Sequence, residues 1–407
     1  MIIRPVRREE FAEFVRVLEL SAGRRLTPEA LTDGVEAYPL DRTLALVDEG
    51  TIVGGTASDH LGLTVPGPVT MPVTRVTLTA TLPTHRGHGH VSQLLTAQAR
   101  DLSARGEVLL VASTSTPGLV ERVGYGAAAS AVQIEVQTGT ALLDARGPAD
   151  HGRIRFSDPP DYALLADVFA QHCRQRPGQI HRSEQFWRLW GMDRPLYRIG
   201  EGERFVVIRE NQQGHLDGYL TYRLSAGSLR EQPIERLVVE DLIALTDAAS
   251  RALWRYCLTF TQARLVQAPN ASCDEPVRWM LADPRRLRVV GMHDFLWLRI
   301  LDVTAVLAAR RYGTDGDLTI RVRDAQIAAN NGSFRLVAGA TQTTCAPTDE
   351  PGELELDIRD LAAVYLGGTP VSTLHRAGRI TELVAGAVAR ADALFASQPA
   401  PWTVTDW

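Results

Sequence analysis

The chain has 407 residues, of which 45% are hydrophobic and 22% are charged, a composition typical of folded globular proteins. Its formal net charge of −5 excludes the broad basic surface that non-specific binding to nucleic acid or to an anionic membrane requires. Its length exceeds what a single hydrophobic core usually supports, so we expect two or three domains.

Four cysteines are scattered along the sequence without Cys-x-x-Cys spacing. This pattern predicts neither a disulfide framework nor a zinc site, and it suits a reducing compartment. The first residues lack an apolar signal core, and no run approaches the eighteen apolar residues of a membrane-spanning helix. We therefore expect a cytoplasmic protein that uses no metal ion.

The first third of the chain predicts alternating strands and helices. In chain order we expect a strand at 2–3, a helix that ends near 20, strands at 43–48, 51–56 and 73–82, a helix at 91–104 and a strand at 108–112. The last three elements form a strand, turn, helix and strand in the manner of a βαβ unit.

The rest of the chain mixes both kinds of element. We expect strands at 205–209, 218–224 and 235–243, a helix at 247–261, strands at 318–322, 332–337 and 354–357, and helices at 358–366 and 380–394. A break near 147–151 and the start of a new pattern near 297 divide the chain. We expect three domains, at 1–150, 151–295 and 296–407.

The turn at residues 86–90, which reads Arg-Gly-His-Gly-His, has the clearest chemical potential. A turn that opens a helix presents backbone N–H groups at the positive end of the helix dipole, which suits a pyrophosphate. Glycines let a ligand approach the backbone closely, and arginine adds a fixed charge. By spacing alone, a purely structural turn is the favoured interpretation, because a glycine-containing turn before a helix is more often just a turn. The histidines His85, His88 and His90 point in different directions on so tight a turn, which argues against a metal site.

A second candidate is Tyr125, which glycines flank on both sides in the segment 121–126. A tyrosine on a crowded glycine turn can project its hydroxyl towards a ligand. Most single tyrosines are core or interface residues, however, so the spacing alone leaves the role of Tyr125 open.

Together these segments resemble the GNAT N-acyltransferases, and more closely the Eis-type (enhanced intracellular survival) subgroup. The similarity covers nearly the whole chain, and its carriers are the segments 63–67, 83–86, 123–126, 217–222, 278–284, 365–370 and 389–395. The resemblance implies an α/β (α+β) fold, with two tandem GNAT-like domains followed by an α+β domain similar to sterol carrier proteins. It also implies a hexamer in which only the first GNAT domain binds acetyl-CoA.

The resemblance also implies roles for individual residues. Tyr125 matches the general acid that protonates the departing thiolate, and Trp407 matches the last residue, whose α-carboxylate acts as the base. Glu36 and Asp406 are the acids expected near the amine substrate. The cofactor-binding positions that it implies are Leu78, Thr79, Thr81, Arg86, Gly87, His88, Gly89 and His90.

The function implied is direct transfer of an acetyl group, in a ternary complex, to an amine of a small molecule such as an aminoglycoside-like or natural-product amine. The turn departs from the family pattern, which usually has a run of arginines where this chain has only Arg86. This departure leaves open an alternative, a GNAT-fold protein with a degenerate cofactor site that serves as a small-molecule binder or scaffold. A lipid-binding role for residues 296–407 is a second alternative, although a purely structural role is favoured there.

Overall fold

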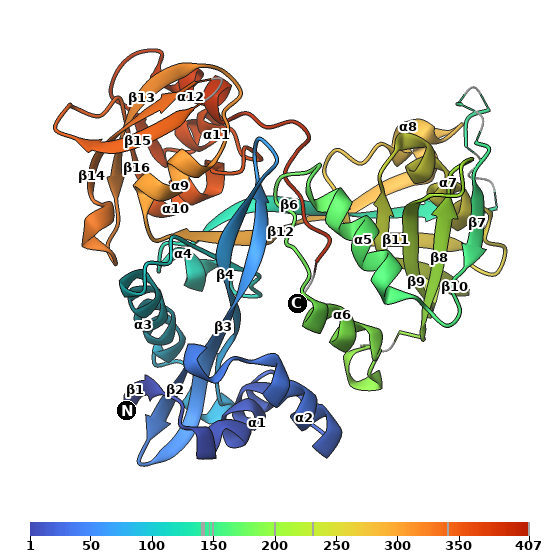
Figure 1. The fold of residues 1–407 in the computed structure, drawn as a ribbon, viewed down its shortest axis with the longest axis horizontal. Helices are drawn as coiled ribbons and strands as arrows, with labels where there is room; N and C mark the ends of the chain where they lie inside the picture. Colours follow the sequence, from blue (N-terminus) through green and yellow to red (C-terminus); the bar gives the residue numbers. More distant parts are fainter. Residues whose placement is uncertain are drawn as a thin grey trace. The chain divides into compact units, whose positions relative to one another are not determined.

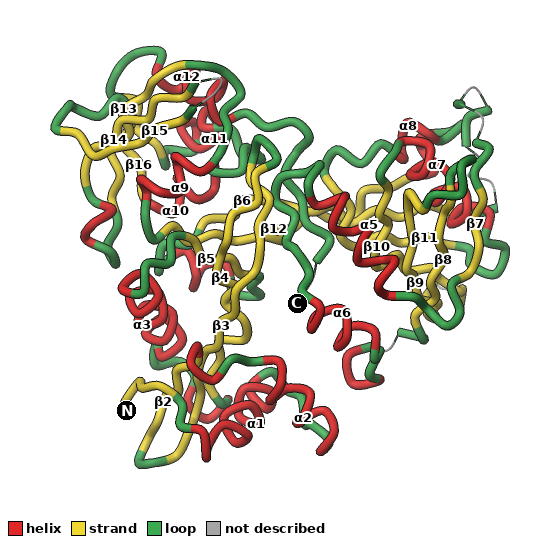
Figure 2. The backbone as a smooth tube through the Cα atoms, viewed as in Figure 1, coloured by secondary structure: helices red, strands yellow, loops and turns green. Residues whose placement is uncertain are grey.

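The computed structural model describes residues 1–139, 143–145, 147–148, 150–198, 201–229, 232–339 and 342–405. The described residues divide into two compact units, each of which is treated by itself. Unit 1 consists of Met1–Ala129 and Phe295–Pro401, and unit 2 consists of Ser130–Asp294 and Trp402–Thr405. Figure 1 shows the chain as a ribbon, and Figure 2 shows where its helices and strands lie. No helix in these described ranges is both long enough and apolar enough to span a membrane.

The N-terminal part of unit 1 is a sheet with helices on it. Its strands follow the order β1-β2-β3-β4-β5-β12, antiparallel except for the parallel pair β4–β5. The strands are β1 (Ile2–Pro5), β2 (Thr43–Asp48), β3 (Thr51–Val65), β4 (Val69–Thr81), β5 (Leu109–Ala112) and β12 (Leu287–Ile300), which contributes its last residues here. The helices are α1 (Phe11–Ser21), α2 (Pro28–Ala37), α3 (His90–Ala104) and α4 (Pro117–Glu121).

Apolar residues at helical spacing fix α1 on this sheet. Phe14, Val15 and Leu18 of α1 are fully buried in a cluster that includes Ala45 of β2 and Ala57 of β3. Burying a large aliphatic or aromatic side chain contributes about 1.5–3 kcal/mol, so this face holds the N-terminal helix in place.

The remainder of unit 1 is a five-stranded sheet in the order β15-β14-β13-β16-β17, with helices. Its elements are α9 (Val303–Ala309), β13 (Gly316–Arg323), β14 (Gly332–Ala338), β15 (Thr343–Thr348), β16 (Leu354–Asp357), α10 (Ile358–Val364), α11 (Val371–Arg376), β17 (Ile380–Glu382) and α12 (Ala387–Phe395).

The helix predicted at 380–394 is wrong over its first part. Residues 380–382 form β17, because they pair with β16 at Leu354↔Glu382 and Leu356↔Ile380. Gly386 then adopts a left-handed conformation, with φ +87°, and α12 begins at the next residue. Pairing with a strand distant in sequence has overridden the local helical pattern.

Unit 2 repeats the sheet-and-helix arrangement. Its strands follow the order β12-β6-β11-β10-β9-β8-β7, in which β10–β11 is the parallel pair. The strands not yet bounded are β6 (Gly126–Gln137), β7 (Arg153–Phe156), β8 (Arg204–Glu210), β9 (Leu216–Leu229), β10 (Gln232–Ala244) and β11 (Leu265–Ser272). The helices are α5 (Tyr162–Cys173), α6 (Glu184–Gly191), α7 (Asp247–Thr259) and α8 (Val277–Met280).

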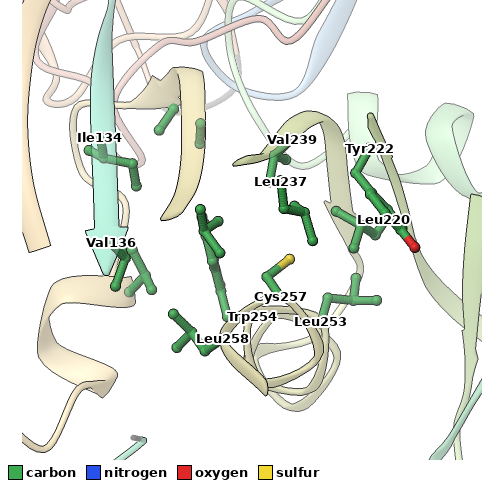
Figure 3. Packing of buried hydrophobic residues seen from close by; sticks show 14 of the residues in the cluster. Ile134, Val136, Leu220, Tyr222, Leu237, Val239, Leu253, Trp254, Cys257 and Leu258 are labelled. Atoms are coloured by element: carbon green, nitrogen blue, oxygen red, sulfur yellow. The ribbon is translucent and has the colours of Figure 1, made fainter. Parts of the chain in front are cut away.

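The core of unit 2 forms where α7 packs on the sheet. Cys257 of α7 points towards Leu237 of β10, with Leu253 and Trp254 on either side of it, as Figure 3 shows; Val239 of β10 belongs to the same cluster. Leu253, Trp254, Cys257, Leu237 and Val239 are all buried, so the helix expected at 247–261 packs on the sheet through one apolar face.

Candidate active site

The parallel pair β4–β5 separates after two residue pairs and leaves one edge of β4 open. Thr74 pairs with Leu110 and Arg75 with Val111, after which the pairing stops, although β4 continues to Thr81. Residues 76–81 therefore have backbone groups on that side without a strand partner in the described part of the chain. An extended ligand arm can form hydrogen bonds with such an edge, in the way that an added strand does.

A β-bulge shapes β4 at the same place. Thr56 lies opposite Thr79 and Ser58 lies opposite Val76, so that two residues, Thr77 and Leu78, oppose Ala57 alone. The bulge bends β4 where it leaves β5. The hydroxyls of Thr79 and Thr56 lie 2.6 Å apart in a hydrogen bond across the two strands, which fixes this bent segment.

The turn between β4 and α3 is open to a ligand. Gly87 and Gly89 have φ values of +86° and +75°, which favour glycine, and a Cβ at either position would meet no atom within 4 Å. Gly89 is the N-cap residue of α3, and no side chain caps the helix there. The first N–H groups of α3 thus have no side-chain cap at the positive end of a helix of four turns.

Basic side chains surround this turn. Arg86 donates from Nη2 to the carbonyl of Ser21 at 2.7 Å, so it ties the turn to the last residue of α1. The rings of His88 and His90 lie 5.7 Å apart, and His90 Nδ1 lies 3.3 Å from Gln93 Oε1. Within the described residues, no group of three His, Cys, Asp or Glu side chains is placed to hold a metal ion.

Tyr125 follows α4 and begins the approach to β6. Its side chain is 1% exposed and packs among Val76, Leu95 and Trp297. Its hydroxyl is buried without a hydrogen-bond partner. A buried hydroxyl without a hydrogen-bond partner costs about 1–3 kcal/mol of desolvation free energy. A ligand atom that accepted a hydrogen bond from it would remove that cost. Burial raises the pKa of the Tyr125 phenol well above its usual range, so the hydroxyl stays protonated at neutral pH.

Arg299 of β12 lies behind the Tyr125 turn. A Cβ at Gly124 would lie only 2.8 Å from its Nε, and its charge acts to lower the pKa of Tyr125, against the effect of burial. Both groups of the pair between Arg299 and Asp324 are fully buried, with hydrogen bonds of 2.9 and 2.8 Å. Asp324 is held in turn by the side-chain amide of Asn330 at 2.9 Å.

These features fit a ligand that carries a diphosphate and an extended arm, as coenzyme A does. The uncapped helix and the glycine turn suit the diphosphate, the free edge of β4 suits the arm, and the unpaired phenol suits a group that takes up a proton. All these features belong to unit 1.

The structure places most of the predicted site residues. Leu78, Thr79 and Thr81 lie on the separated part of β4, and residues 86–90 form the turn that follows it. Tyr125 packs against Val76 of the same strand. Glu36 is an exposed residue of α2. Asp406 and Trp407 lie outside the described residues.

Sequence reasoning missed Arg299 and the bulge at Thr77 and Leu78. The arginine lies far from Tyr125 in the sequence, and only the pairing of β12 with β5 brings the two together. The bulge carries no special residue, since Thr and Leu are ordinary strand residues, so its signal in the sequence is weak.

The chain matches three protein-family models. Residues 2–128 match an acetyltransferase (GNAT) domain, residues 178–300 match a second acetyltransferase (GNAT) domain, and residues 303–404 match a sterol carrier protein domain.

Three similar proteins span almost the whole chain. An uncharacterized N-acetyltransferase from Streptomyces griseus is 33% identical over 411 residues, which cover 98% of each chain. The N-acetyltransferase Eis from Mycobacterium tuberculosis is 28% identical over 397 residues, 95% of this chain and 92% of Eis. The crystal structure of Eis1 from Mycobacterium abscessus superposes with a TM-score of 0.86 at 29% identity and covers 100% of both chains.

Proposed function

Because the chain belongs to the Eis-type family of GNAT N-acetyltransferases, we propose that it transfers an acetyl group directly from acetyl-CoA to an amine of a small molecule, within a ternary complex. Two GNAT domains and a sterol carrier protein domain follow one another along it, which confirms the expected fold class. The observation that carries the proposal is the buried, unpaired hydroxyl of Tyr125 beside the separated strands β4 and β5.

Unit 1 supplies the residues that would hold acetyl-CoA. The N–H groups at the start of α3, with Arg86, would bind the diphosphate, and the backbone of Leu78, Thr79 and Thr81 would pair with the pantetheine arm. His88 and His90 replace the arginines usual in the family. A neutral imidazole still donates one hydrogen bond, and a protonated one adds a charge.

Two proton transfers accompany the reaction. The amine nitrogen bonds to the thioester carbonyl carbon as the carbon–sulfur bond breaks, and the Tyr125 hydroxyl gives its proton to the departing sulfur. The apolar surroundings that raise the pKa of the phenol also raise the proton affinity of a thiolate formed there. The amine attacks after its ammonium form has lost one proton to water, and the α-carboxylate of Trp407 accepts the second proton that the nitrogen loses as the amide forms. No covalent enzyme intermediate forms.

Further features follow from the same proposal. The acceptor is an aminoglycoside-like or natural-product amine, which Glu36 and Asp406 attract because amines are cationic at neutral pH. We also propose a cytoplasmic hexamer, with the catalytic domain at 1–150, a second GNAT-like domain without cofactor at 151–295 and the sterol-carrier-like domain at 296–407.

The decisive experiment measures release of free thiol from acetyl-CoA in the presence of a panel of polyamines and aminoglycosides. Tyr125→Phe removes only the acidic proton, so kcat should fall by about 10²–10⁴ while the Kd of acetyl-CoA, from calorimetry, stays the same. Tyr312→Phe is the matched control, because that tyrosine is also in unit 1 and its hydroxyl already donates to the Leu307 carbonyl at 2.8 Å.

Other outcomes would count against the proposal. Tight binding of acetyl-CoA without turnover of any amine contradicts a transferase with this substrate class. Failure to bind acetyl-CoA at micromolar concentration favours the degenerate binder or scaffold. Equal losses in Tyr125→Phe and Tyr312→Phe remove Tyr125 from the mechanism.

A further inference from the structure

Unit 2 contains a strand separation like the one between β4 and β5. The parallel pair β10–β11 covers Arg236↔Leu265 to Val238↔Gln267, after which the pairing stops. A β-bulge between Val239 and Asp241 bends β10 at that point, as the bulge in β4 does. Beyond it lies a small cavity, whose lining includes Val239, Leu242, Trp254, Ala268, Asn270 and Trp402.

Trp402, from the C-terminal segment, forms part of the wall of this cavity. Its indole N–H donates to the carbonyl of Asn270 at 2.9 Å, and its backbone N–H donates to the carbonyl of Pro177 at 2.9 Å. Asn270 lies where the register of β11 against β6 shifts, which spares its carbonyl for the indole. The ring of Trp402 packs edge-on against His172, and the guanidinium of Arg176 lies 5.5 Å from its centre.

Gly178 admits the backbone of the same segment. Its φ is +88°, and a Cβ there would lie 2.8 Å from the backbone nitrogen of Trp402. An L-residue at this position would be strained and would also displace the segment. The segment therefore approaches residues 177–178 as closely as a paired strand would.

Arg182 binds Thr405, the last residue that the structure describes. Its Nε donates to Thr405 Oγ1 at 3.1 Å, and its two Nη atoms donate to Asp241, with the Nη2 bond at 2.9 Å. The Tyr219 hydroxyl also donates to Asp241, at 3.0 Å. The guanidinium lies 4.3 Å from the ring centre of Phe169, and the Arg182 and Asp241 side chains are at most 3% exposed.

The C-terminal segment is well buried in unit 2, because Trp402 and Thr405 are only 7% and 2% exposed.

We propose that the second GNAT-like domain uses the space after its separated strands to bind the C-terminal segment Trp402–Thr405, where the first domain would bind a cofactor, and that Arg182 is a positioning residue for this segment. The inference rests on the proposed function, in which the α-carboxylate of Trp407, which follows this segment, is the base. Release of the segment from unit 2 should therefore lower turnover, although unit 2 itself binds no acetyl-CoA.

The test combines hydrogen exchange with kinetics on the full-length chain. In Gly178→Ala the backbone amides of 402–405 should exchange their hydrogens about tenfold faster or more, because the segment dissociates from the rest of unit 2. The kcat for amine acetylation should fall about tenfold to a hundredfold, as expected for a misplaced catalytic group, with the Kd of acetyl-CoA unchanged. Thr405→Val removes the hydroxyl that Arg182 binds. It should also speed exchange at 402–405 and lower kcat with the Kd of acetyl-CoA unchanged, but by less than Gly178→Ala does.

Gly214→Ala is the matched control. Gly214 also has a positive φ, +78°, but a Cβ there would meet no atom within 4 Å, so both readouts should stay at wild-type values. Unchanged exchange of residues 402–405 in Gly178→Ala would contradict the proposal that unit 2 binds this segment. Faster exchange with unchanged kcat overturns the positioning role, provided that deletion of Trp407 abolishes turnover. If deletion of Trp407 leaves kcat unchanged, the proposed base is wrong and the positioning role falls with it.

Discussion

The two turns that follow the parallel strands differ in ways that set their chemistry. In unit 1 residues 82–89 connect β4 to α3, and the first N–H groups of that helix have no side-chain cap. In unit 2 only residues 245–246 connect β10 to α7, and the Thr246 hydroxyl accepts from the Ala249 N–H at 3.1 Å. Asp247 adds a negative charge in the first turn of α7. The same scaffold thus presents one turn suited to a phosphate and one that disfavours it.

The regions beside the two separated strand pairs also differ in what they contain. In unit 1 the Tyr125 hydroxyl is buried and unpaired, whereas in unit 2 Trp402 packs in the region and both its indole N–H and its backbone N–H have acceptors within the unit. Each unit also has a buried arginine–aspartate pair, Arg299–Asp324 in unit 1 and Arg182–Asp241 in unit 2. The comparison teaches that the region with an unpaired phenol is where a ligand is expected, and that the region that holds a residue of the chain itself has a structural use of the same scaffold.

The largest expected effect tests whether the Arg299–Asp324 pair supports the turn that carries Tyr125. Arg299→Met leaves Asp324 buried without its charge partner, so the free energy of unfolding should fall by about 3–5 kcal/mol. Arg335→Met should cost less than about 1 kcal/mol, because the pairs that Arg335 makes with Asp317 and Glu350 are exposed. Urea unfolding of the full chain measures both losses. Similar small losses in the two variants would mean that Arg299 does not support the Tyr125 turn.

The second expected effect is a pH dependence in unit 2. His172 donates from Nδ1 to the Ala244 carbonyl, while its Nε2 is buried without a partner. Burial is the main cause that lowers the pKa of His172 to about 4, and the nearby Arg176 acts in the same direction. The unfolded chain binds a proton below about pH 6.5, whereas the folded chain resists it, so stability is lost as the pH falls from about 6.5 to 4.

The loss of unfolding free energy attributable to His172 should reach at most about 3 kcal/mol. Above pH 6.5 this residue should not make the unfolding free energy depend on pH. It is measured as the difference in unfolding free energy between the wild type and His172→Gln across that range. His215→Gln, at an exposed loop position, serves as the control. Because Trp402 packs on His172, exchange at 402–405 should accelerate over the same range. A constant difference between wild type and His172→Gln would contradict the buried neutral imidazole.

The sequence predicted the elements on either side of the first turn well. The strand expected at 73–82 and the helix at 91–104 are confirmed as Val69–Thr81 and His90–Ala104, because strand alternation, Pro83 and the glycines are local signals. The expected fold class is confirmed as well, since the resemblance depended on segments spread over the whole chain.

Features that depend on distant contacts were not predictable. Arg299 reaches Tyr125 only through the pairing of β12 with β5, and Arg182 reaches Thr405 across most of the second half of the chain. No local pattern distinguishes these two arginines from the exposed ones. The error over the first residues of the helix predicted at 380–394 has the same origin, because residues 380–382 are strand only through their pairing with β16.

The smallest expected effect returns to the two turns and separates them by charge. Calorimetry should find one acetyl-CoA site per chain. Arg86→Gln should raise the Kd about tenfold to a hundredfold, since a charge-assisted hydrogen bond to phosphate contributes about 1.5–3 kcal/mol. Asp247→Asn should leave the Kd and the stoichiometry unchanged, because the Thr246 cap still occupies the start of α7. A thermal unfolding midpoint within a few degrees of wild type shows that the Arg86 effect is not loss of its bond to Ser21. Two acetyl-CoA sites per chain, or equal effects of the two variants on the Kd, would mean that the two turns are equivalent. The distinction between unit 1 and unit 2 would then be wrong.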